Sequence, residues 1–195
     1  LDVIEADHLS KSFGPVTAVD DVSIQGEEEG IFGVLGPNGA GKTTTIRRLT
    51  GILTPDTGRV RIGGIDIHGD PLAAKLKMGV IPENSTVYGD MTAEQNVLWA
   101  AKFYGMDRAT RERRAKEILG RMGLGDRKGG MVRTFSKGMR QRVSIACAIV
   151  HMPEILILDE PTSGADIHSR TEFYTLLADL NRDRGIAIVL SSHDI

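Results

Sequence analysis

The feature that most constrains the fold of this chain is a glycine-rich loop at residues 36–45, which reads Gly-Pro-Asn-Gly-Ala-Gly-Lys-Thr-Thr-Thr. Its first eight residues match G-x-x-x-x-G-K-[ST], a pattern whose backbone N–H groups surround phosphate. An apolar run at 31–35 predicts a buried strand before the loop, and residues 43–53 predict a helix after it. A strand, a glycine loop and a helix N-terminus together indicate a site for the phosphates of a nucleotide.

The residue types in the loop suggest a role for each part of this site. Lys42 is expected to reach the β- and γ-phosphates, and the Thr43 hydroxyl is expected to ligate Mg²⁺. The expected nucleotide-binding residues of the loop are Gly36, Pro37, Asn38, Gly39, Ala40, Gly41, Lys42, Thr43 and Thr44. The alternative is a glycine turn that happens to precede a lysine, so the downstream sequence has to decide between the two.

Composition narrows the classes of protein that remain. The chain has 195 residues, 41% of them hydrophobic, and is expected to form one domain with at most a small inserted subdomain. The formal net charge of −2 argues against a dedicated nucleic-acid-binding protein, and the single cysteine, Cys147, cannot form an intrachain disulfide. No apolar run reaches the roughly 20 residues of a membrane-spanning helix, so a membrane role requires a partner or another part of a longer polypeptide.

Two kinds of sheet are predicted from the strand patterns. Extended stretches at 3–9, 16–24 and 59–62, with turns starting at Phe13 and Asp56, predict an N-terminal antiparallel sheet. The other strands alternate with helices, which predicts a mostly parallel, doubly wound α/β sheet. Those strands are expected at 31–35, 78–81, 155–158 and 186–190.

A helical insert is predicted between the strands of the second sheet. A capping box at 92–95 starts its first helix, and we expect a helical subdomain at about 84–150, with the core at about 1–83 and 151–195. The chain starts at Leu1 rather than methionine and stops just after a strand-like run. We therefore expect a single domain whose C-terminal part is truncated.

An acidic pair follows the aliphatic strand at 155–158. Ligands of parallel sheets bind at the carboxyl ends of the strands, which places Asp159 and Glu160 near the phosphate loop. Two adjacent carboxylates repel each other, and a bound Mg²⁺ would stabilise Asp159. Glu160 could then orient and deprotonate an attacking water. The alternative is an ordinary strand that ends in a polar turn.

A second predicted anion site lies at residues 135–142, which read Phe-Ser-Lys-Gly-Met-Arg-Gln-Arg. Ser136 is a good N-cap, and Gly138 permits close approach of the backbone, so the start of this helix can bind an anion. One chain does not need two γ-phosphate sites, whereas a dimer does. The two sites therefore favour a nucleotide shared between two chains.

These motifs, in this order, resemble the ATP-binding domain of ABC transporters across essentially the whole chain. Residues 36–43 resemble that family's Walker A loop, and 155–160 resemble Walker B with its catalytic glutamate. Residues 135–139 lie at the position of the family's signature, and 163–166, ending in Asp166, resemble its D-loop. His193 resembles the switch histidine, and Phe13 occupies the place of the aromatic residue that stacks on adenine.

The chain departs from the family pattern at two places that matter for chemistry. The signature, usually Leu-Ser-Gly-Gly-Gln, keeps Ser136 and Gly138 but loses the glutamine contact. Glu83 stands where the family has its Q-loop glutamine, and when ionised it can still ligate Mg²⁺ but cannot donate a hydrogen bond. These departures resemble a branch that serves drug-resistance and sodium-export systems.

The resemblance implies a P-loop NTPase fold of the RecA-like type and an ATPase that drives a membrane transporter, expected to be an exporter. Its implied ligands are ATP and Mg²⁺, with Thr43, Asp159 and Glu83 at the metal. Glu160, Lys42 and His193 are the implied catalytic residues. The implied partners are a second ATPase domain and a transmembrane permease subunit, which would hold the chain at the cytoplasmic face of the cell membrane, and no nucleic acid is expected.

Two rival functions remain at this point. A soluble ABC-type ATPase could act on ribosomes, DNA or cofactor assembly, although such proteins tend to carry paired domains or a long coiled coil. A P-loop kinase or GTPase would need an acceptor site and lid, or an Asn-Lys-x-Asp motif, and the sequence has neither. The sequence identifies neither the transported substrate nor the direction of transport.

Overall fold

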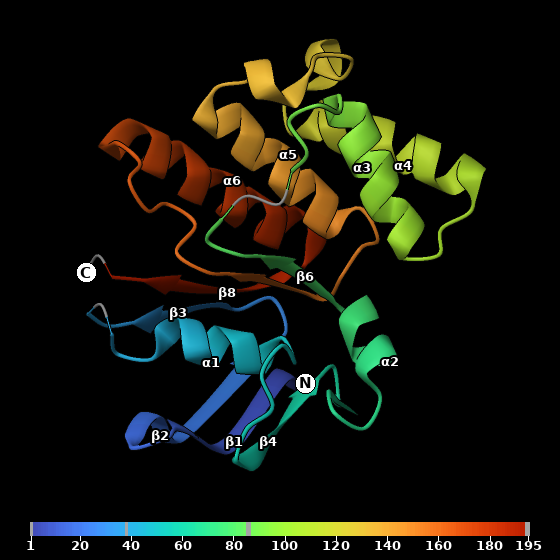
Figure 1. Ribbon diagram of the computed structural model, residues 1–195. Coiled ribbons are helices and arrows are strands. Elements are labelled where there is room, and N and C mark those ends of the chain that lie inside the picture. Colours follow the sequence, from blue (N-terminus) through green and yellow to red (C-terminus); the bar gives the residue numbers. More distant parts are fainter. Residues whose placement is uncertain (1, 38, 85–86, 194–195) are drawn as a thin grey trace. The chain divides into compact units, whose positions relative to one another are not determined.

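The computed structural model describes residues 2–37, 39–84 and 87–193 (Figure 1). The chain divides into two compact units, which are described separately. One consists of Leu1–Glu83 with Glu154–Ile195 and is called the sheet unit. The other, Asn84–Pro153, is called the helical unit.

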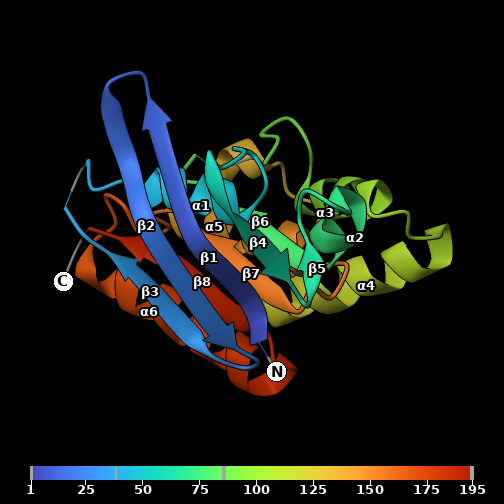
Figure 2. The same cartoon turned by 90° about the horizontal axis from the view of Figure 1, so that it is seen from below.

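The first sheet of the sheet unit is antiparallel, as the sequence predicts, with the strand order β2-β1-β4-β5. Its strands are β1 (Asp2–Phe13), β2 (Val16–Glu27), β4 (Thr57–Ile62) and β5 (Ile65–Asp66). Figure 2 shows β1 and β2 as one long hairpin. The turn predicted to start at Phe13 is confirmed, because Gly14 and Pro15 form the turn and the flanking residues Phe13 and Val16 pair with each other. The turn predicted at Asp56 is wrong beyond that residue, because β4 begins at Thr57.

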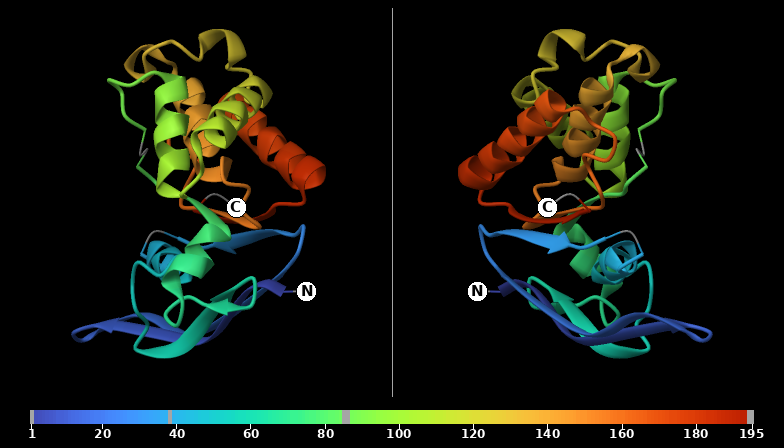
Figure 3. Two further views of the ribbon diagram at one scale, coloured as in Figure 1. Left: turned by 90° about the vertical axis from the view of Figure 1, so that its right-hand side faces the viewer. Right: turned by 90° about the vertical axis from the view of Figure 1, so that its left-hand side faces the viewer.

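The second sheet is parallel in all four of its described strands, with the order β3-β8-β7-β6. The strands are β3 (Ile31–Leu35), β6 (Met78–Ile81), β7 (Ile155–Leu158) and β8 (Ala187–Ser192). Helices α1 (Lys42–Leu49) and α6 (Ile167–Arg184) lie on opposite faces of this sheet in Figures 1 and 3, and α2 (Pro71–Leu76) precedes β6. The predicted doubly wound α/β core is thus confirmed.

The main hydrophobic core of the sheet unit lies where α1 packs between the two sheets. Ile46 and Leu49 of α1 are almost fully buried together with residues of both sheets, among them Ile4, Ile62 and Val189. The predicted helix over 43–53 is too long. Gly51 has a φ of +69°, and the N–H groups of residues 52 and 53 both donate to the Arg47 carbonyl, so the helical hydrogen-bond pattern stops there.

The helical unit consists mainly of three packed helices. These are α3 (Ala93–Phe103), α4 (Arg108–Arg121) and α5 (Lys137–Ile149), with short 3-10 turns at Gly125–Arg127 and Val132–Thr134. Thr92 and Gln95 form the predicted capping box at the start of α3, in which each side chain bonds to the other residue's backbone N–H. The apolar face of α4, with Ala115, Ile118 and Leu119, is buried.

Candidate nucleotide-binding site

The glycine loop connects β3 to α1 and closes tightly on the β1–β2 hairpin. Gly41 has a φ of +82°, and a Cβ at this position would lie 2.2 Å from the Ala18 carbonyl oxygen, so only glycine fits. Within the described part of the chain, the α1 N-terminus has no side-chain cap and no acidic residue in its first turn. Its backbone N–H groups and partial positive charge can therefore serve an anionic ligand. Asn38, predicted to bind nucleotide, lies outside the described residues.

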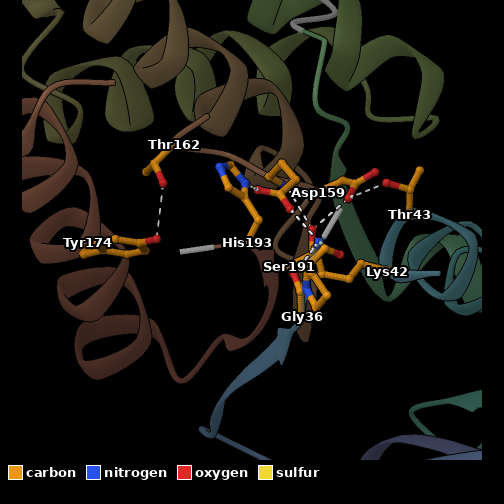
Figure 4. Close-up of polar contacts among 10 residues, drawn as sticks. Gly36, Lys42, Thr43, Asp159, Thr162, Tyr174, Ser191 and His193 are labelled. Atoms are coloured by element: carbon orange, nitrogen blue, oxygen red, sulfur yellow. Dashed lines mark hydrogen bonds and ion pairs between the residues drawn. The ribbon is translucent and has the colours of Figure 1, made fainter. Parts of the chain in front are cut away.

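Lys42 places a buried ammonium group at the mouth of this loop. The residue is 7% exposed, and Nζ donates to the carbonyl oxygens of Gly36 at 2.7 Å and Pro37 at 3.0 Å (Figure 4). The same atom lies 3.3 Å from Glu160 Oε1. The lysine of the loop is thus ion-paired with the second residue of the acidic pair.

Asp159 and Glu160 occupy two different environments at the carboxyl end of β7. Asp159 is 5% exposed, and its Oδ1 accepts hydrogen bonds from Ser191 Oγ at 2.7 Å and from Thr43 Oγ1 at 3.4 Å. Glu160 has a φ of +44°, unusual for a side chain of this size, and its backbone N–H donates to Ser191 Oγ at 2.9 Å. Its Oε2 lies 2.7 Å from Nδ1 of His193.

The charge of Glu160 is set by these contacts. Burial alone would raise the pKa of the Glu160 carboxyl group, but the hydrogen bonds and charges of His193 and Lys42 outweigh that effect and lower it. Glu160 is therefore ionised at neutral pH. An ionised carboxylate can accept a proton from a water molecule held next to it.

Lys42, Glu160 and His193 line one cavity of about 470 Å³, a size typical of small-molecule sites. The cavity gathers loop residues with Glu83, Glu160 and His193, which are far apart in the sequence. Its lining residues are Ala18, Gly39, Gly41, Lys42, Thr43, Thr44, Glu83, Glu160, Ser163 and His193. The parallel register explains why Glu160 and His193 come together. Leu158 of β7 pairs with Leu190 of β8, so the residues that follow both strands lie at the same edge of the sheet.

The other predicted site residues lie elsewhere. Phe13, at the end of β1, is 49% exposed, and Asp166 caps α6 through the Ser169 N–H at 2.9 Å. Ser136 caps α5 in the helical unit by accepting from the Met139 N–H at 3.2 Å, and Gly138 follows in the first turn. The structure therefore explains Asp166 and Ser136 as helix caps without assigning them a ligand.

Sequence reasoning missed Ser191, which bonds to both members of the acidic pair. The residue is fully buried at the end of β8, directly beside the chain that leaves β7. The sequence did contain a signal for this role. Ser191 is a polar residue near the end of an otherwise aliphatic strand, two positions before the candidate His193. Ala18 also lines the cavity without having been predicted, and Ser163 lines it as the first residue of the segment that resembles the D-loop.

The fold and the site together define a class of protein. A phosphate loop between a parallel strand and a helix, with an acidic pair at the end of another strand of the same sheet, is the arrangement of P-loop nucleoside triphosphatases. The family model for ABC transporters matches residues 19–163. The chain belongs to the ABC transporter family, as an ATP-binding domain with its characteristic fold.

Individual relatives agree with this assignment. The linearmycin resistance ATP-binding protein LnrL of Bacillus subtilis is 37% identical over 191 residues, which cover 98% of this chain and 61% of LnrL. The ABC transporter ATP-binding protein NatA of the same organism is 39% identical over 179 residues, 91% of this chain and 72% of NatA. The structure of cbiO1 from Clostridium perfringens, part of the ABC transporter complex cbiONQ, matches 99% of this chain and 79% of its own with a TM-score of 0.90 at 25% identity. The chain thus spans about three-fifths of the length of LnrL.

Among the described residues, no helix is both long enough and apolar enough to cross a membrane.

Proposed function

We propose that this chain binds and hydrolyses ATP as the motor subunit of an ABC exporter. The observation that carries the proposal is the convergence of Lys42, Glu160 and His193 on one cavity at the phosphate loop. The names of LnrL and NatA, each an ATP-binding protein and the first a resistance protein, support the choice of an exporter.

The proposed reaction is the attack of water on the γ-phosphorus of ATP. The water oxygen forms a bond to phosphorus, the bond from phosphorus to the β–γ bridging oxygen breaks, and ADP leaves with that electron pair. Glu160 accepts the proton of the water, for which its lowered pKa keeps it ionised. Lys42 and His193 would donate to the phosphate oxygens, where negative charge develops.

The residues around Asp159 fit a magnesium ion. Thr43 and Asp159 present a hydroxyl and a carboxylate oxygen 3.4 Å apart, and both are the hard oxygen ligands that Mg²⁺ prefers. Glu83 lines the same cavity and is the third proposed ligand. A bound Mg²⁺ would neutralise charge on the β- and γ-phosphates. Ser191 would hold the Asp159 carboxylate in place, since it already donates to Oδ1.

The proposed assembly contains two ATPase domains and a membrane partner. The α5 N-terminus, with Ser136 and Gly138, has no acidic residue in its described first turn and would bind the γ-phosphate held by the second copy. Asp166 would lie at the same interface, and Phe13 would stack on the adenine. A transmembrane permease subunit would hold the pair at the cytoplasmic face of the membrane.

We assign the core of the ATPase domain to about residues 1–83 and 151–195 and its helical subdomain to about 84–150. The division of the structure at residues 83 and 153 supports this assignment.

The test is ATP turnover by the full-length protein with its permease, comparing Glu160→Gln with Glu154→Gln. Glu154 is a suitable control, because it forms an exposed ion pair with Lys77 in the same unit. Glu160→Gln should bind ATP, accumulate as a dimer in gel filtration and lose at least ~100-fold in turnover, as expected for loss of a general base. Wild-type turnover by Glu160→Gln would refute the proposed role, and activity that requires ribosomes rather than the permease would favour a soluble ATPase.

A further inference from the structure

Asp56 attaches the end of β1 to the loop that follows α1, next to the pairing of Ser10 with Thr57 in the sheet. Its Oδ1 lies 2.5 Å from Lys11 Nζ, and its Oδ2 accepts from the Ser12 N–H at 2.8 Å. The Asp56 N–H donates to the Ser10 carbonyl at 3.1 Å. Three consecutive residues of β1 are therefore held by one residue of the loop.

Phe13 is the next residue of β1 and is directly affected by this attachment. Lys11 Nζ lies 5.7 Å from the centroid of the Phe13 ring, within cation–π range. Because the ammonium group occupies one face of the ring, a planar base can stack only on the other face. Phe13 is 49% exposed, so the ring has room for such a partner.

The charges around Asp56 favour its ionised form. The hydrogen bond from Lys11, followed by that from the Ser12 backbone, lowers the pKa of the Asp56 carboxyl group, and the positive charge of Arg48 acts in the same direction. Arg48 belongs to α1, the helix that starts at Lys42. The loop carrying Asp56 follows α1 after a few residues, so the hairpin end is linked to the helix that forms the phosphate site.

We propose that Asp56 is a positioning residue for the base of the bound nucleotide: it holds Lys11 and Ser12, and through them the Phe13 ring, in register with the phosphate loop. The proposal rests on the proposed function, in which Phe13 stacks on adenine. Its specific consequence is that Asp56 affects the affinity for a nucleotide that carries a base, and leaves the affinity for a bare triphosphate unchanged.

The experiment measures equilibrium binding of two probes, ATP and inorganic tripolyphosphate, both with Mg²⁺, to the full-length protein. The variants are Phe13→Ala, Asp56→Asn and their combination, with Asp21→Asn as the matched control. Asp21 is an exposed acid on the same hairpin that contacts His8 at 2.7 Å. Asparagine has the shape of aspartate and leaves the backbone hydrogen bond intact, so Asp56→Asn should fold.

We expect Phe13→Ala to weaken ATP binding about 5- to 100-fold, the range for loss of one base–aromatic stack. Asp56→Asn should weaken it by roughly 3- to 10-fold, about the net value of one ordinary hydrogen bond. Neither variant should change tripolyphosphate binding more than about twofold. The double variant should be no weaker than Phe13→Ala, because Asp56 acts through that ring.

Each other outcome contradicts a definite part of the reasoning. Equal losses for ATP and tripolyphosphate in Asp56→Asn would show a general structural role and overturn the proposal. An ATP affinity lowered by Phe13→Ala but not by Asp56→Asn would overturn it while the proposed function stands. An unchanged affinity in Phe13→Ala would refute base stacking and this inference together, and Glu160→Gln would still test hydrolysis independently.

Discussion

Replacement of Arg48 by methionine should stabilise this protein, because the arginine is a buried charge with little to compensate it. Its side chain is fully buried in α1, and Nε, Nη1 and Nη2 have no hydrogen-bond partner among the described residues. Burial lowers the pKa of the Arg48 guanidinium, and the nearby charge of Asp56 offsets part of that effect. Desolvation of an ionised group in this position costs free energy that no hydrogen bond among the described residues offsets.

The expected magnitude follows from what the substitution removes and keeps. Replacing buried charged groups by apolar side chains of similar size stabilises proteins by about 1–4 kcal/mol. Methionine retains the flexible apolar stem and is a good helix former beside Ile46 and Leu49. The lost attraction to the exposed Asp56 is weak, because solvent screens the charge of that carboxylate. The free energy of unfolding should therefore rise by about 1–3 kcal/mol, and Tm by about 2–10 °C for a chain of this length.

Equilibrium unfolding in urea, checked by thermal unfolding, measures this change. Arg47→Met is the matched control, because it is the same substitution one position earlier on the exposed face of α1. It should change stability by less than about 0.5 kcal/mol. A loss of more than about 1 kcal/mol in Arg48→Met with a neutral control would show that the guanidinium is paired in the native protein, and would refute the reasoning.

Three further predictions follow from the site and the core. Ser191→Ala removes the donor to Asp159 and the acceptor for the Glu160 N–H, so steady-state kinetics should show turnover reduced at least ~10-fold with ATP binding retained. The folded-state pKa of Glu160 is lowered, so the wild-type protein should gain most stability over Glu160→Gln above the ordinary pKa of glutamate. That gain should be lost as the pH falls through the lowered pKa, and urea unfolding at several pH values measures it. Burial raises the pKa of Cys147 to about 12, so iodoacetamide should alkylate it far more slowly in the folded protein than after unfolding.

The sequence predicted the phosphate loop well because its constraints are local. The positive φ of Gly41 and the close approach of the Ala18 carbonyl require a glycine within the motif itself. The length of β1 was not predictable in the same way. His8 and Asp21 both adopt a φ of +49°, and the β1–β2 register shifts around them. Such irregularities let a strand continue where apolar and polar residues no longer alternate. The alternation pattern of a single sequence does not reveal where these irregularities occur.

The polar environment of the acidic pair was predictable only in part. The rule that parallel strands present their carboxyl ends to ligands correctly placed Glu160 and His193 at the same cavity as the loop. The role of Ser191 depends on which strand lies beside β7 and in which register. Neither fact is contained in the local sequence, so the hydrogen bonds of Ser191 required the structure.

The contacts of Glu160 have a consequence for nucleotide binding. In the structure, Lys42 and His193, the two groups proposed to bind the γ-phosphate, are both engaged by the carboxylate proposed to activate water. A triphosphate must therefore compete with that carboxylate for the same donors. The negative charge of Glu160 also repels the negative charge of the γ-phosphate. Removing the charge in Glu160→Gln should thus raise the intrinsic affinity for a non-hydrolysable ATP analogue, quite apart from its effect on turnover. ADP, which lacks the γ-phosphate, should gain less, and the difference between the two nucleotides separates this competition from a general change in the site.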